Sequence, residues 1–168
     1  MHSPDRVANL LGATALVATD VMLSATTRAV PVSPSGAAAL VVLRTSPGLG
    51  VTELGRRVGL TQSASARMVD SLGDLVEREP TGGRGVSVRL TGAGAEAADA
   101  LLAARDEPLT DLLTVLDEHQ RETLGELLSL LLGRLYERVG STELMCRLCD
   151  RATCTTGASC PVGEAARR

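Results

Sequence analysis

The residues best suited to chemistry in this 168-residue chain are its four cysteines, all of which fall within the last 23 residues. Two cysteines separated by two residues can present both sulfurs from one turn, and Gly157 and the residue before Pro161 bend the chain back towards them. The spacing Cys-x2-Cys-x4-Cys-x5-Cys-Pro therefore predicts four thiolates that converge on one metal centre. These ligands are Cys146, Cys149, Cys154 and Cys160.

Three kinds of site are compatible with this spacing. Structural zinc uses four thiolates, although zinc sites more often contain two Cys-x2-Cys pairs and this segment has one. An iron–sulfur cluster of the [2Fe–2S] or [4Fe–4S] type uses the same ligands. The segment is similar to the C-terminal cluster segment of the redox regulator SoxR, in which the third cysteine lies nearer the second. A disulfide pair is disfavoured in a reducing cytoplasm. We therefore expect an iron–sulfur cluster, with Zn²⁺ as the alternative.

Composition limits the partners that the chain can have. The protein contains one Tyr and no Phe or Trp, so it lacks the aromatic platform on which single-stranded nucleic acid stacks. The formal net charge of −3 does not by itself indicate nucleic-acid binding, but only the docking face needs to be basic. No Ser–His–Asp set, paired-carboxylate pocket or Gly-rich phosphate loop is recognisable, so we do not expect an enzyme.

The sequence also argues against a membrane span and a signal peptide. The longest uncharged run covers residues 29–43 and is broken by Pro31 and Pro34, which makes it too short to cross a bilayer. Near the N-terminus, Asp5 interrupts the basic region that a signal peptide needs, and Asp20 stands where cleavage would occur. We expect a cytoplasmic protein without membrane contact.

Hydrophobic periodicity predicts a mainly helical chain with one small β-hairpin. Residues 86–90 alternate apolar and polar side chains like a half-buried strand, after a turn at residues 80–83. The predicted helices cover residues 5–29, 37–44, 53–58, 62–77, 92–117 and 120–139. Three threonines stand where helix caps are expected, and these are Thr52, Thr61 and Thr91.

Two short helices joined by a tight turn at Gly59 and followed by a hairpin predict a winged helix-turn-helix. The second helix has an apolar face and a short-chained, hydrogen-bonding and basic face, which suits the major groove of DNA. Arg84 is flanked by glycines at the hairpin tip, where a minor groove would accept it. A polar helix pair with a purely structural hairpin would share this pattern. The candidate DNA-binding residues of the second helix are Thr61, Gln62, Ser63, Ser65 and Arg67.

Residues 51–92 resemble the MarR family of dimeric bacterial transcription regulators. The matching pieces are ELGRRVGL, TQSASARMVDSL, LVERE and VRLTGAG. The resemblance implies a homodimer that binds a pseudo-palindromic operator in double-stranded DNA. Gly82 stands where the family commonly has an Asp that steadies the wing. The small aromatic acids that the family usually binds would find no Phe or Trp in this chain.

The resemblance also implies a division of the chain into three regions. Residues 5–34 and 92–140 would form a helical dimerisation region, with the long helices of both chains interlocked. Residues 35–91 would form the winged helix-turn-helix, and residues 141–168 the cysteine segment that binds metal.

Together these observations predict a DNA-binding regulator that senses redox state, oxygen or nitric oxide through an iron–sulfur cluster. The cluster would follow the last dimerisation helix, so its loss could shift that helix and the spacing of the two recognition helices. One alternative is the same regulator with structural zinc and another input signal. A second is an iron–sulfur electron carrier or scaffold in which the helix-turn-helix no longer functions.

Overall fold

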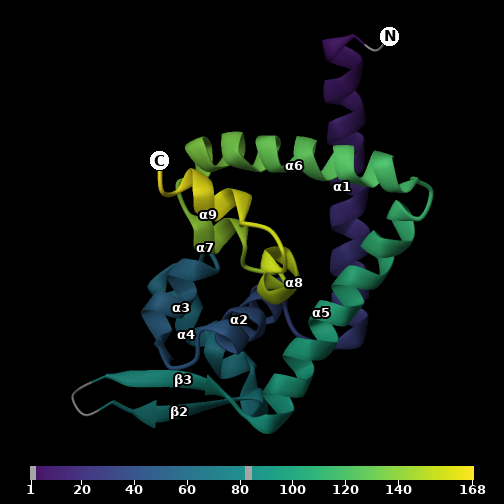
Figure 1. Ribbon diagram of the computed structural model, residues 1–168. Helices are drawn as coiled ribbons and strands as arrows, with labels where there is room; N and C mark the ends of the chain where they lie inside the picture. Colours follow the sequence, from purple (N-terminus) through teal and green to yellow (C-terminus); the bar gives the residue numbers. More distant parts are fainter. Residues whose placement is uncertain (1–2, 82–84) are drawn as a thin grey trace.

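The structure is a computed structural model that describes residues 3–81 and 85–168, and it is mainly helical with a small antiparallel sheet (Figure 1). The fold class expected from the sequence is confirmed. The helices are α1 (Pro4–Ala29), α2 (Pro34–Thr45), α3 (Val51–Arg57), α4 (Gln62–Ser71), the 3-10 turn η1 (Gly73–Leu75), α5 (Gly92–Leu113), α6 (Glu118–Val139), α7 (Thr142–Met145), α8 (Arg151–Thr155) and α9 (Pro161–Ala165). The strands are β1 (Leu49–Gly50), β2 (Val76–Pro80) and β3 (Val86–Leu90).

Helix α2 forms the centre of the core. Ser33 caps the helix by accepting a hydrogen bond from the Gly36 N–H, and Pro34 supplies a first turn with a preset φ. Every residue from Gly36 to Leu43 is buried, in one cluster with apolar residues of α3, α4 and α5. The buried helix predicted over residues 37–44 is confirmed.

The helix predicted over residues 62–77 is wrong in its second half. Helix α4 ends at Ser71, and the chain then passes through η1 into β2. Gly73 adopts a φ of +53°, which ends the helical path and which glycine reaches without a steric penalty. Leu75 and Val76, expected on the apolar face of one long helix, instead pack against the core from η1 and β2.

The sheet has the strand order β1-β3-β2, and both pairs are antiparallel. Strands β2 and β3 form the wing, with Val76 opposite Leu90 and Pro80 opposite Val86. The strand predicted over residues 86–90 is confirmed. Strand β1 has only two residues, which is too short to produce a recognisable alternation, so sequence analysis did not find it.

Two of the three predicted helix caps are confirmed. The Thr61 and Thr91 side chains accept hydrogen bonds from the N–H groups of Ala64 and Gly94. The prediction for Thr52 is wrong, because α3 begins at Val51, two residues before the predicted start at residue 53, with Gly50 as its N-cap. Gly50 also pairs with β3, so α3 begins directly where β1 ends.

Three long helices surround the winged domain (Figure 1). Helix α1 packs along α5, and α6 crosses the opposite side of the molecule from the wing. Helix α5 ends at Leu113, four residues before the predicted end at 117. Asp117 then caps α6 in a capping box with Gln120, so α6 begins earlier than predicted.

Helices α1 and α6 expose large apolar side chains. No residue of α6 is buried. The exposed residues of these two helices are Val7, Leu10, Leu11, Leu16, Val17, Val21, Leu127, Leu128, Leu130, Leu131, Leu135 and Val139. Large apolar side chains gathered on the exposed faces of two helices are typical of a surface that another protein covers.

Helix α1 is also long and apolar enough to cross a membrane, judged by length and composition alone. This helix is not an uncharged run, because Asp20 lies within its apolar stretch. Core helices of soluble proteins and signal sequences have the same length and composition. The absence of membrane contact therefore stays a prediction.

Candidate nucleic-acid interface and metal site

Helices α3 and α4 form a helix-turn-helix pair. The turn contains Gly59, whose φ of +79° lies in the left-handed region that favours glycine. The Leu60 N–H closes the turn by donating to the Gly55 carbonyl over 2.8 Å. The Thr61 cap then starts α4 immediately, so the angle between the two helices is set by a short, fully hydrogen-bonded connection.

Ser65 lies in the contact between the two helices rather than on the exposed face. Its side chain is fully buried, and its hydroxyl donates to the Thr61 carbonyl over 2.7 Å. A Cβ placed on Gly55 would overlap the Ser65 Oγ and lie 2.5 Å from the Ser65 Cβ. The prediction that Ser65 faces DNA is therefore wrong: a small residue is needed there because α3 and α4 touch.

The other candidate residues of α4 point to solvent. Gln62, Ser63 and Arg67 are exposed, and so is the capping Thr61. Arg67 makes no hydrogen bond or ion pair with any residue between 3 and 81 or between 85 and 168. Its guanidinium is therefore available to a ligand, and Arg is the side chain that most often reads guanine in the major groove.

The wing is joined to α4 by a charge pair that sequence analysis missed. Arg78 of β2 donates to Asp70 of α4 over 2.5 Å, and Arg89 of β3 donates to Glu79 over 2.5 Å. Arg78 lies just beyond the helix predicted over residues 62–77, in the LVERE piece that precedes the hairpin, and no strand or ion pair was predicted for it. The predicted wing-tip residue Arg84 lies outside the described residues, as does Gly82.

The four cysteines line one cavity of about 400 Å³. The cavity lies between the cysteine segment, α2 and α3, and Figure 1 shows this yellow C-terminal segment between α6 and the helix-turn-helix. All four thiols are free of disulfide bonds. Val41 and Val42 of α2 and Arg57 of α3 complete the wall, together with charged residues of the cysteine segment itself, which are Glu143, Arg151 and Arg167.

Each thiol interacts with that of the next cysteine along the chain. The Cys149 thiol donates a hydrogen bond to the Cys146 sulfur, which lowers the pKa of Cys146 and raises that of Cys149. Burial is the main cause that raises the pKa of Cys154 to about 11, and its contacts with Cys149 and Cys160 add to the rise. Cys146 is therefore the first of the hydrogen-bonded pair to become the thiolate that binds metals.

Arg105 of α5 places a positive charge near this site. Hydrogen bonds from Thr153 are the main cause of the lowered pKa of Asp150, and the charge of Arg105 adds to that lowering. The same charge opposes the rise of the Cys149 pKa. Arg105 pairs with Asp106, but its buried Nε has no hydrogen-bond partner among the described residues. A buried donor without an acceptor is uncommon and costly.

The donor set fits a thiolate-bound metal group in type and number. Four cysteines are the usual ligands of both structural zinc and iron–sulfur clusters. In the described residues, however, no three His, Cys, Asp or Glu side chains stand close enough to hold a metal ion as they are arranged here. Loading the site would therefore draw the sulfurs closer together than this conformation places them.

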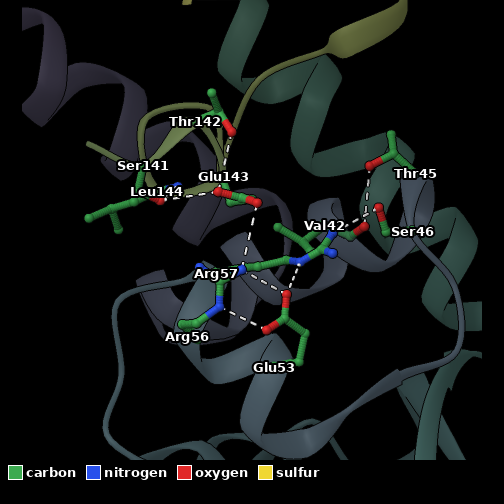
Figure 2. Close-up of polar contacts among 10 residues, drawn as sticks. All are labelled: Val42, Thr45, Ser46, Glu53, Arg56, Arg57, Ser141, Thr142, Glu143 and Leu144. Atoms are coloured by element: carbon green, nitrogen blue, oxygen red, sulfur yellow. Dashed lines mark hydrogen bonds and ion pairs between the residues drawn. The ribbon is translucent and has the colours of Figure 1, made fainter. Parts of the chain in front are cut away.

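The helix-turn-helix reaches the cavity through α3 (Figure 2). Glu53 accepts hydrogen bonds from Arg56 and Arg57, each over 2.8 Å, and Arg57 also donates to the Ser46 Oγ over 3.1 Å. The hydrogen bonds from the two arginines lower the pKa of Glu53 to about 2. Arg57 thereby lines the cysteine cavity while it is held by α3 and the end of α2.

Comparison with solved structures identifies the fold. The chain is similar to RV1404 from Mycobacterium tuberculosis, with a TM-score of 0.69 and 20% identity over 78% of this chain and 93% of that one. It is also similar to a MarR family protein from Bacillus stearothermophilus, with a TM-score of 0.67 and 20% identity over 84% of this chain and 100% of the other. The described part of the chain thus has the winged-helix fold of MarR family transcription regulators.

A third neighbour was solved with nucleic acid. It is a mutant of Staphylococcus aureus MepR bound to an oligodeoxyribonucleotide, with a TM-score of 0.59 and 17% identity over 77% of this chain and 97% of that one. No protein-family model and no curated protein matches the sequence. Several of the solved structures that the chain resembles are described as transcription regulators, and MepR is one of them.

Proposed function

We propose that the protein is a homodimeric, cytoplasmic transcription regulator that binds double-stranded DNA and senses redox state, oxygen or nitric oxide through an iron–sulfur cluster held by its four cysteines. The observation that carries the proposal is the single cavity lined by all four thiols and by Arg57 of the helix-turn-helix. The proposed metal site and the proposed DNA-binding motif of one chain are thus in direct contact through Arg57.

The exposed face of α4 supports DNA binding. Gln62 and Arg67 offer hydrogen-bond donors near the N-terminal half of the helix, and the buried face of α4 is anchored to the core by Met68 and Val69. In helix-turn-helix proteins this part of the second helix contacts base edges in the major groove. The DNA complex of the similar MepR mutant supports the same use of the fold.

The exposed apolar surface of α1 and α6 supports a dimer formed by these helices. A second copy of the chain would cover apolar side chains that the isolated chain leaves in water. Two copies related by a twofold axis would place their α4 helices on the half-sites of a pseudo-palindromic operator, about 34–36 Å apart.

The charges around the cavity support a negatively charged metal group. Four thiolates bound to Zn²⁺ or to an oxidised iron–sulfur cluster leave a net charge of about −2. Arg57, Arg151 and Arg167 line the cavity. The charge of Arg105 acts on Cys149, and the buried Arg105 Nε has no hydrogen-bond partner in the part of the chain that the structure describes. When bound, an iron–sulfur cluster would supply a redox couple whose potential depends on such nearby charges and hydrogen bonds.

Metal analysis of anaerobically purified protein tests this proposal. Brown protein with matched iron and sulfide supports the cluster, whereas colourless protein with one zinc per chain would make the segment a structural clip with the input signal elsewhere. Cys149→Ser should lose the bound metal, because it removes one of four ligands. Ser159→Ala is the matched control, since Ser159 lines the same cavity without a sulfur and this variant should retain the metal.

Operator binding tests the regulatory part of the proposal. A duplex selected by the protein from a random library should bind with different affinity to oxidised, reduced and metal-free protein. The switch would fail if Cys149→Ser removed the chromophore and left operator affinity unchanged under every redox condition. If no sequence-specific duplex binding were found at all, an electron carrier or scaffold would replace the regulator as the best account.

A further inference from the structure

Helix α7 leads directly into Cys146, and Figure 2 shows its residue Glu143 beside Arg56 of α3. Glu143 of α7 lies 3.6 Å from the Arg56 guanidinium of α3, measured from Oε1 to Nη2. Leu144 of α7 covers the turn after α3, with its Cδ1 3.0 Å from the position that a Cβ on Gly59 would take. The α7 helix thus contacts both the first helix and the turn of the DNA-binding motif.

The same helix ends in a metal-ligand candidate. Cys146 is the C-cap of α7, and its N–H donates to the Thr142 carbonyl over 3.0 Å. The Cys146 carbonyl in turn accepts from the Cys149 N–H over 3.0 Å. A displacement of the Cys146 sulfur therefore acts on a single hydrogen-bonded turn that includes Glu143 and Leu144.

Arg56 lies within reach of two carboxylates, one on α3 and one on α7. It forms a close two-point pair with Glu53 at 2.8 Å and a looser pair with Glu143 at 3.6 Å. Glu143 is held in place by hydrogen bonds from the hydroxyls of Ser141 and Thr142, both over 3.2 Å. A shift of α7 would thus change the Arg56 interactions while Glu53 keeps the guanidinium attached to α3.

Helix α3 passes such a shift to α4 because the two helices are in direct contact. The Gly55–Ser65 approach leaves no space in which α3 could move without moving α4. Helix α4 carries Gln62 and Arg67 on its outer face. The physical connection therefore runs from Cys146 through α7 and α3 to the recognition helix of the same chain.

We infer that α7 is a coupling element that reports the loading of the cysteine site to the helix-turn-helix of its own chain, through Glu143 and Leu144. The inference rests on the proposed function and specifies the contacts through which the cysteine site would affect the helix-turn-helix. Loading draws the four sulfurs together, repositions Cys146 and α7, and thereby changes how α7 rests on α3 and on the Gly59 turn. This route does not require a change in the spacing of the two subunits.

Hydrogen exchange in the full-length protein tests the route without DNA. Amide exchange of residues 51–71 is compared between anaerobically loaded protein and the same protein after chelation under dithiothreitol. We expect the exchange of α3 amides to change about threefold or more on unloading in the wild type, because α7 loses its defined position. In Glu143→Gln that response should fall by about half or more, since the amide cannot pair with Arg56 as an anion.

Glu137→Gln is the matched control. It also removes one carboxylate and one exposed ion pair, with Arg134, but lies on α6 away from α3. It should retain the wild-type response. Leu144→Ala, which removes the apolar contact at Gly59 and no charge, should reduce the response independently of Glu143.

Three outcomes would overturn the route. The first is an unchanged exchange of residues 51–71 when wild-type protein is unloaded. The second is a full response in both Glu143→Gln and Leu144→Ala. The third is failure of either variant to load, as judged by metal content, because that residue would then hold the site rather than report it. Wild-type protein with no bound metal would instead contradict the proposed function, so the two failures are distinguishable.

Discussion

The helix-turn-helix and the cysteine segment differ in what holds them together. Helices α3 and α4 are anchored by Leu54, Met68 and Val69 in the main core, and their connection is fully hydrogen-bonded. In residues 141–168, by contrast, Val162 alone is buried, and the helices have four or five residues each. Helices of that length are not stable by themselves.

This difference indicates that the two regions depend on different sources of stability. The helix-turn-helix is preformed by apolar packing and is expected to keep its shape in every state. The cysteine segment has little packing of its own, so a bound metal group would contribute much of its order. A region whose order depends on a ligand is suited to sensing that ligand.

The largest expected effect comes from breaking the preformed half. Gly55→Ala would place a methyl group where the Ser65 Oγ already lies, so α3 and α4 must separate. We expect a loss of about 1–3 kcal/mol in the free energy of unfolding, as overpacked cores show, measured by urea denaturation. Gly92→Ala is the control, because a Cβ there meets nothing within 4 Å and stability should change by less than about 0.5 kcal/mol. Equal stability of both variants would show that the two helices are not tightly packed.

Two substitutions with intermediate expected effects distinguish the exposed face of α4 from its buried face. Arg67→Ala should weaken operator binding about 10- to 100-fold while leaving the unfolding midpoint unchanged, because Arg67 is exposed and has no partner among the described residues. Ser65→Ala should do the opposite, lowering stability by about 1 kcal/mol through the lost buried hydrogen bond and sparing affinity. Fluorescence anisotropy and urea denaturation measure the two quantities. A loss of affinity in Ser65→Ala at unchanged stability would return Ser65 to the DNA interface.

The smallest effect concerns the charges of α3 that face the cysteine segment. The two arginines lower the pKa of Glu53 from 4.5 to about 2, so this carboxylate stabilises the fold fully above pH 4.5 and loses its contribution as the pH falls towards 2. Because the Glu53 side chain is 38% exposed, we expect less than about 1 kcal/mol. The difference in urea midpoint between metal-free wild type and Glu53→Gln should therefore shrink between pH 5 and pH 3. A difference independent of pH would assign the effect to packing instead of charge.

Local signals in the sequence were sufficient where a short-range interaction decides the structure. The Thr61 and Thr91 caps, the buried helix α2 and strand β3 were predicted because caps, apolar runs and alternation involve neighbouring residues. The end of α4 was missed, since an apolar pattern that continues to Val76 overrode the helix-ending role of Gly73. The φ angle of a glycine within a helical pattern cannot be predicted from the sequence, because glycine adopts positive and negative φ almost equally well.

The exposure of particular side chains could not be predicted in the same way. Ser65 looks like a DNA-facing polar residue in the sequence, and only the close approach of Gly55 from another helix explains its burial. Arg78 and Asp70 are eight residues apart and pair only because the chain turns back from α4 through η1 into β2. The sequence did contain a signal for the burial of Ser65, because Gly55 and Ser65 are both small residues on the two helices of the predicted helix-turn-helix.

The amino-acid sequence by itself determined the class of the fold, the candidate reading face of α4 and the four-thiol donor set, because residue type and spacing along the chain are enough to specify each of them. The tertiary structure alone decided that the cysteine cavity shares Arg57 with the helix-turn-helix and that Glu143 of α7 lies 3.6 Å from Arg56. These contacts join residues about 90 positions apart, and such pairs are created by the packing of the whole chain, which no local pattern records.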